Sequence, residues 1–101
     1  MVRERYLMQV RDGQLEEFWE ICRKLNEVNR ARGRREFSFW ASAGGVSNEV
    51  VAEVDSPDHA SRQQQFDAFH ADPEALGLDE KLHECLVEGS MRSELLEEVP
   101  V

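Results

Sequence analysis

The chain has 101 residues, with 12 basic against 21 acidic side chains and a formal net charge of -9 at pH 7. A chain of this length can bury one modest core, so we expect a single domain over residues 1–101. The negative charge has the wrong sign for neutralising phosphates, which argues against nucleic acids and anionic membrane surfaces as partners.

The N-terminal residues are charged where a signal peptide needs an apolar core, and no apolar run approaches the roughly 20 residues that span a bilayer. We therefore expect a cytoplasmic protein without membrane contact. Cys22 and Cys85 are the only cysteines and form no CxxC pair. We interpret them as reduced, partly buried thiols rather than as a disulfide or a zinc site.

The first third of the chain predicts a strand followed by a long helix. Residues 3–10 alternate as a strand does, with Tyr6, Met8 and Val10 on one face and Leu7 and Gln9 on the other, and Asp12-Gly13 predicts a turn. From residue 14 to 32, apolar residues recur every three or four positions, which indicates a helix of about five turns. The stripe consists of Leu15, Phe18, Trp19, Cys22, Leu25 and Val28. Gly33 is expected to end this helix.

The middle of the chain predicts a hairpin and then a second helix. Strands are expected at residues 35–42 and 48–54, because the AGGVS segment between them supplies the glycines that a tight turn needs. Ser56-Pro57 predicts the start of the second helix, with Ser56 as its cap. This helix should run to about Ala71.

The last third is less regular. Asp72-Pro73 should interrupt the helical pattern, and a shorter helix is expected at residues 74–84, which Gly77 could split. We interpret the final segment, CLVEGSMRSELLEEV, as a strand with an irregularity near Gly89.

This element order predicts an α+β, ferredoxin-like (split βαβ) fold with a four-stranded antiparallel sheet. Helices should cover the sheet face that carries Tyr6, Met8, Val10, Phe37, Phe39, Ala41, Val50, Ala52 and Val54. Leu7, Trp40 and Val51 would then lie on the opposite face, where burial of each would contribute roughly 1.5 to 3 kcal/mol. A second copy of the chain packed sheet to sheet would bury them, so we expect a homodimer.

Four segments, YLMQVRDGQLEEFWEICRKL, VVAEVDSPDHA, ADPEAL and GSMRSELLEEV, carry a family resemblance through their order and spacing. Together they resemble the dimeric α+β barrel superfamily, in particular its NIPSNAP-like proteins and antibiotic-biosynthesis-type monooxygenases. The resemblance implies two chains that join their sheets in a barrel, each with a pocket between its own sheet and helices. Members include cofactor-free monooxygenases, polyketide cyclases, isomerases and proteins of no established activity.

The haem-degrading members of the superfamily carry an Asn, a Trp and a His that would fall here near Tyr6, Val54 and Leu78. None of the three matches, so haem degradation is not expected and no cofactor is predicted. Metal binding is not expected either, because His59 and His70 lie roughly 16 Å apart along one helix. The arginine cluster RARGRR is interpreted as the solvated end of the first helix.

The second helix offers the most specific indication of a site. One face of this helix carries His59 together with Arg62, Gln63, Phe66, Phe69 and His70. That face is too polar for a helix whose only role is packing. We hypothesise a mostly apolar pocket with Tyr6 and His70 as catalytic candidates. The ligand-binding candidates are Met8, Phe39, Ala52, Gln63 and Phe66. The alternative is that the polar side chains reach solvent at the margin of the helix and Tyr6 is a core residue.

Two functions are compatible with these residues. One is a cofactor-independent monooxygenase or cyclase that acts on a small apolar or aromatic metabolite, with an imidazole that can titrate near neutral pH as its acid or base. The other is a non-catalytic, dimeric ligand-binding or stress-associated NIPSNAP-like module. A pocket on which Tyr6 and His70 converge would favour the first.

Overall fold

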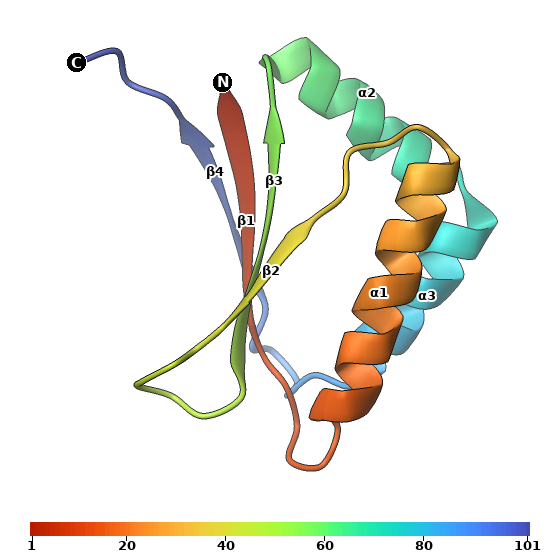
Figure 1. The fold of residues 1–101 in the computed structure, drawn as a ribbon, viewed down its shortest axis with the longest axis vertical. Helices are drawn as coiled ribbons and strands as arrows, with labels where there is room; N and C mark the ends of the chain where they lie inside the picture. The colour runs from red at the N-terminus through yellow and green to blue at the C-terminus, as the bar shows by residue number, and fades with distance from the viewer.

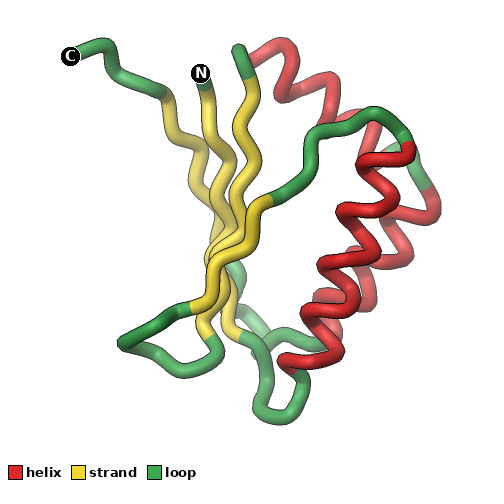
Figure 2. Tube along the Cα trace, in the orientation of Figure 1, coloured by secondary structure: helices red, strands yellow, loops and turns green.

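The computed structural model describes residues 1–101 and packs three helices against one face of a four-stranded antiparallel sheet (Figures 1 and 2). The elements in chain order are β1 (Val2–Gln9), α1 (Leu15–Ala31), β2 (Ser38–Ala41), β3 (Glu49–Ser56), α2 (His59–His70), α3 (Pro73–Glu84) and β4 (Arg92–Glu97). The strand order is β2-β3-β1-β4. The predicted α+β, ferredoxin-like fold is confirmed. No helix is both long enough and apolar enough to cross a membrane.

The register of β1 with β3 brings the inward-facing side chains of the two strands together. Met8 lies opposite Val50 and Tyr6 lies opposite Ala52. Met8, Val50 and Ala52 are buried beneath the helices, as the alternation in the sequence predicts. Ala41, predicted on the same face, is exposed because β2 ends there and the hairpin turns away from the helices.

Helix α1 supplies most of the cover for this face. Six of its residues are buried: Phe18, Ile21, Cys22, Leu25, Val28 and Asn29. They follow the predicted three- and four-residue spacing, and Phe18 is fully inaccessible. Gly33 follows the helix with a φ of 70°, a conformation that glycine adopts without a steric penalty. Its predicted role as the stop of this helix is confirmed.

The start of α2 differs from the prediction. The cap is Asp58, whose Oδ1 accepts a hydrogen bond of 2.7 Å from the Ser61 N–H. Ser56 belongs instead to β3, where it pairs with Val2 and its hydroxyl accepts a 2.9 Å hydrogen bond from Arg35. The prediction was wrong because two cap-forming residues lie two positions apart, and tertiary pairing uses the first of them.

Helix α3 and β4 also refine the prediction. Asp72 caps α3 with Pro73 as its first residue, and Gly77 does not split the helix. The predicted final strand is correct only from Arg92 onward. The preceding residues form a loop that contains Gly89 at a φ of 75°, so the expected irregularity separates β4 from α3 instead of interrupting a longer strand.

The outer face of the sheet is apolar at one end and ionic at the other. Leu7, Val51 and Trp40 lie side by side in the register, and Trp40 is 58% exposed. Further along β1 the face carries ion pairs of 2.7 Å, from Arg3 to Asp55 and from Arg5 to Glu53. The apolar residues therefore form a local patch on this face and do not extend over the whole sheet.

Candidate functional site

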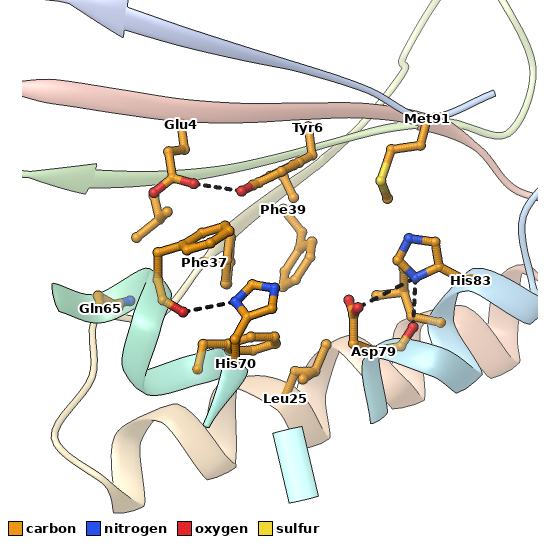
Figure 3. Close-up of a pocket in the computed structure, with 15 residues that line it drawn as sticks. Glu4, Tyr6, Leu25, Phe37, Phe39, Gln65, His70, Asp79, His83 and Met91 are labelled. Carbon is orange, nitrogen blue, oxygen red and sulfur yellow. Dashed lines mark hydrogen bonds and ion pairs between the residues drawn. The ribbon is translucent and has the colours of Figure 1, made fainter. Parts of the chain in front are cut away.

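A cavity of about 310 Å³ lies between the inner face of the sheet and the helices (Figure 3). Its walls are mostly apolar, with a few polar side chains at opposite sides. The lining residues are Glu4, Tyr6, Leu25, Phe37, Phe39, Ala52, Val54, Gln65, Phe66, Phe69, His70, Asp79, Leu82, His83 and Met91. A mostly apolar cavity with a small number of placed polar groups is typical of sites for small molecules.

On the sheet side, Glu4 and Tyr6 share one face of β1 because side chains alternate along a strand. The Tyr6 hydroxyl donates a hydrogen bond of 2.5 Å to Glu4 Oε2. Arg62 of α2 approaches the same carboxylate, with its Nε 3.2 Å from Glu4 Oε1. That Nε forms no hydrogen bond, so the contact is an ion pair without directed donation. The charge of the mostly buried Glu4 is thereby balanced.

The phenol of Tyr6 is held in its neutral form. Burial is the main cause that raises the pKa of Tyr6, and the hydrogen bond to Glu4 raises it further. Since the single phenolic proton points at Glu4, the hydroxyl oxygen can offer a ligand only its lone pairs.

On the helix side, His70 reaches into the cavity from the end of α2, facing Phe37 and Phe39 (Figure 3). Its Nδ1 lies 2.8 Å from the Phe66 carbonyl oxygen. Because a carbonyl can only accept, Nδ1 carries the hydrogen and Nε2 keeps a lone pair in the neutral ring. The ring also packs against Phe66, with centroids 4.2 Å apart. Backbone bond and aromatic contact together fix the orientation that a general base requires.

Helix α3 contributes a second imidazole beside a carboxylate. His83 Nδ1 donates a 2.8 Å hydrogen bond to the Asp79 carbonyl oxygen and lies 3.6 Å from the carboxylate Oδ2 of the same residue. Burial raises the pKa of Asp79, and its side chain has no Arg or Lys within ion-pair distance. Figure 3 shows this pair across the cavity from Glu4 and Tyr6.

Of the sequence-predicted site residues, five line the cavity: Tyr6, Phe39, Ala52, Phe66 and His70. Met8 is buried in the core and Gln63 is exposed, where its amide donates a 2.9 Å hydrogen bond to Asp67. Neither of these two is a lining residue.

Sequence reasoning missed the polar partners Glu4, Asp79 and His83. Signals for them were present. Glu4 stands two residues before Tyr6, which places it on the same strand face, and Asp79 and His83 are four apart on a helix. The single inward carboxylate on β1 was the strongest unused indication, because an unpaired carboxylate is costly to bury.

Other predicted clusters lie apart from this cavity. His59 pairs with Glu97 at 2.7 Å, and no group of three or more His, Cys, Asp or Glu side chains is arranged to hold a metal ion. Three of the four RARGRR arginines pair with acidic side chains: Arg30 with Glu36, and both Arg32 and Arg34 with Asp72. The fourth, Arg35, donates hydrogen bonds to the Ser56 hydroxyl and the Ser61 carbonyl. The expected solvated helix end is therefore correct for Arg30 but not for Arg34, whose side chain is buried against Asp72.

The sequence matches no family model and no curated protein. Several solved structures share its fold. An uncharacterized NIPSNAP domain protein from Burkholderia xenovorans is 20% identical, with a TM-score of 0.79 over 98% of this chain and 95% of that one. A NIPSNAP family protein from Agrobacterium tumefaciens is 13% identical, with a TM-score of 0.77 over 97% of this chain and 85% of that one.

An antibiotic biosynthesis monooxygenase is 14% identical to this chain, with a TM-score of 0.77 over 99% of this chain and 100% of that one. At such identities the likeness is one of fold. The sequence resembles NIPSNAP and monooxygenase-like proteins, and the structure has their fold. The part of the resemblance that concerns the fold is therefore confirmed.

Proposed function

We propose that this protein is a homodimer that binds a small apolar or aromatic metabolite in the cavity between sheet and helices and oxygenates it without a cofactor. The observation that carries the proposal is the fixed imidazole of His70, with its Nδ1 bonded to the Phe66 carbonyl in an apolar cavity of about 310 Å³. Its fold is shared with an antibiotic biosynthesis monooxygenase, which supports this reaction class by analogy only.

The proposed chemistry begins with proton removal from an activated methylene of the bound molecule by His70 Nε2. The carbanion forms a carbon–oxygen bond with dioxygen, the co-substrate. Cleavage of the oxygen–oxygen bond then leaves one oxygen as a ketone, while the other departs as water with both methylene hydrogens. In this scheme Tyr6 is a positioning residue: its hydroxyl oxygen accepts a hydrogen bond where the substrate carries a donor, and its ring packs against the substrate where it does not.

The test is dioxygen uptake with anthrone, a neutral aromatic ketone with one activated methylene. We expect a rate above the spontaneous oxidation, and His70→Gln should lower it about a hundredfold or more, as expected for loss of a general base. His59→Gln is the matched control, because His59 lies on the same helix but outside the cavity. Equal losses in both variants, or no acceleration by the wild-type protein, would contradict the oxygenase proposal.

A non-catalytic binding function is the second candidate, and one observation favours it. The only phenolic proton near the cavity is committed to Glu4, so Tyr6 has no free proton to give to a substrate as a general acid. Mass spectrometry of ligand extracted from the purified protein, together with absence of dioxygen uptake on that ligand, would support this alternative.

The dimer is proposed from the patch formed by Leu7, Val51 and Trp40 on the outer face of the sheet. A second copy with the same patch would bury it symmetrically. We expect a dimer in sedimentation velocity, and Trp40→Asp should produce monomers. Val46→Asp is the control, because Val46 is also exposed but lies in the hairpin outside the sheet. A monomeric wild-type protein at micromolar concentration would rule out the dimer.

A further inference from the structure

Most polar side chains around the cavity present hydrogen-bond acceptors to its interior, because their donor hydrogens are used within the protein. The Tyr6 proton is donated to Glu4, and the Nδ1 hydrogens of His70 and His83 are donated to carbonyls of their own helices. The Gln65 amide bonds the backbone of Arg35 through both its oxygen and its nitrogen, each at 2.8 Å. No Lys or Arg lines the cavity. A ligand that carries hydrogen-bond donors would therefore find partners that a carboxylate would lack.

The two carboxylates of the cavity differ in their partners. Glu4 is balanced by Arg62 at 3.2 Å. Asp79 has only His83 within ion-pair distance, at 3.6 Å, and no Arg or Lys. The cavity thus contains one carboxyl group that no arginine or lysine neutralises.

Aromatic rings form the rest of the wall. Tyr6 and Phe37 lie 6.2 Å apart between centroids, as do Phe37 and Phe39, while Phe66 and Phe69 close the helix side. Ring faces attract organic cations, and the attraction is stronger when the cation is removed from water.

We propose that the cavity selects aromatic molecules that carry an ammonium group, with the ammonium at Asp79 and the ring among the phenylalanines. This inference rests on the proposed function, because it names the ligand class for the same cavity. It excludes carboxylates and phosphates as preferred ligands, since these would face Asp79 without a basic residue to bind them.

The experiment compares three probes of similar size by isothermal titration near neutral pH: naphthylmethylamine, naphthylmethanol and naphthoate. The ammonium should bind about tenfold or more tightly than the alcohol, which corresponds to about 1.4 kcal/mol or more. The carboxylate should bind most weakly. Asp79→Asn should remove most of the ammonium preference, because it should weaken the ammonium probe much more than the alcohol.

Asp67→Asn serves as the matched control, because Asp67 is an exposed carboxylate of α2 that bonds Gln63 outside the cavity. It should leave all three affinities unchanged. Equal affinity for amine and alcohol, or tighter binding of naphthoate, would overturn the inference while the cavity remained a ligand site. An ammonium preference that survives Asp79→Asn would overturn the assignment to Asp79. If no probe binds, the inference and the proposed ligand site both fail.

Discussion

Helices α1 and α2 lie over the same side of the sheet (Figure 1) but are attached to the molecule in different ways. Six residues of α1 are buried, whereas α2 has none. Polar contacts hold α2 instead: Arg62 to Glu4, and Gln65 to the backbone of Arg35. The apolar side chains of α2 that face inward, Phe66 and Phe69, line the cavity. One helix therefore stabilises the fold, while the other forms a wall of the candidate site.

The largest expected difference between the helices is in stability. Phe18→Ala in α1 removes a fully buried ring and should lower the free energy of unfolding by about 3 to 5 kcal/mol. Phe66 in α2 is 37% exposed at the edge of an existing cavity, and Phe66→Ala should cost about 1 kcal/mol or less. Urea titration followed by circular dichroism measures both. Similar costs would show that α2 contributes to the core as α1 does.

A smaller difference is expected from two side-chain amides that hold the segment before β2. Asn26 of α1 bonds both the N–H and the carbonyl of Phe37 at 2.8 Å, and Gln65 of α2 does the same for Arg35. Asn26→Ala should cost about 2 kcal/mol and Gln65→Ala about 1 kcal/mol, because α2 has no buried residue and should shift to admit water more readily than α1.

Gln64 provides the control for this pair, because it is the exposed neighbour of Gln65 on α2. Gln64→Ala should change stability by less than about 0.5 kcal/mol. Thermal unfolding of the three variants gives the order, and a larger loss for Gln65→Ala than for Asn26→Ala would reverse the comparison between the helices.

The smallest effect is spectroscopic. Tyr6 is the only tyrosine, so the absorbance of the phenolate reports on this site alone. Because burial raises its pKa in the folded state, phenolate should appear only well above the ordinary value of about 10. The unfolded chain loses this proton at a lower pH than the folded protein does. The contribution of the neutral Tyr6 phenol to stability is therefore complete below about pH 10 and is lost as the pH rises above that value.

Variants of the neighbours should sharpen the titration. Glu4→Gln should lower the pKa of Tyr6, since the bond to Glu4 raises it, but the pKa should stay above its ordinary value because burial is the larger cause. Arg62→Gln should raise it, since the charge of Arg62 opposes the shift. Titration of the folded wild-type protein at the ordinary value would mean that α2 does not cover Tyr6 in solution.

The same contrast explains how far the sequence could be interpreted. The spacing of Phe18, Cys22 and Leu25 predicts α1 because burial requires that period. Strand alternation likewise predicts the inner face of β1 and β3. Ser56 and Asp58 could each cap a helix, and only the pairing of Ser56 with Val2 across the sheet decides between them.

The candidate site could be predicted from the sequence only in part. Tyr6, Phe66 and His70 could be proposed because their elements were recognisable and their faces followed from periodicity. The contacts between residues of different elements could not be derived in the same way. Glu4 meets Arg62 from a different element, and Asp79 lies opposite Tyr6 only after the chain has passed through α2 and entered α3. Such meetings depend on tertiary distances that local patterns do not contain.

The central position of β1 has a consequence for the order in which the molecule opens. This strand is hydrogen-bonded on both sides, to β3 and to β4, so its amide protons should be among the last to exchange with solvent. Glu4 and Tyr6 stand on this doubly paired strand, whereas His70 stands on the helix without buried residues. Local opening of α2 would thus let a ligand enter and leave the cavity while β1, on the opposite side of the cavity, kept its geometry.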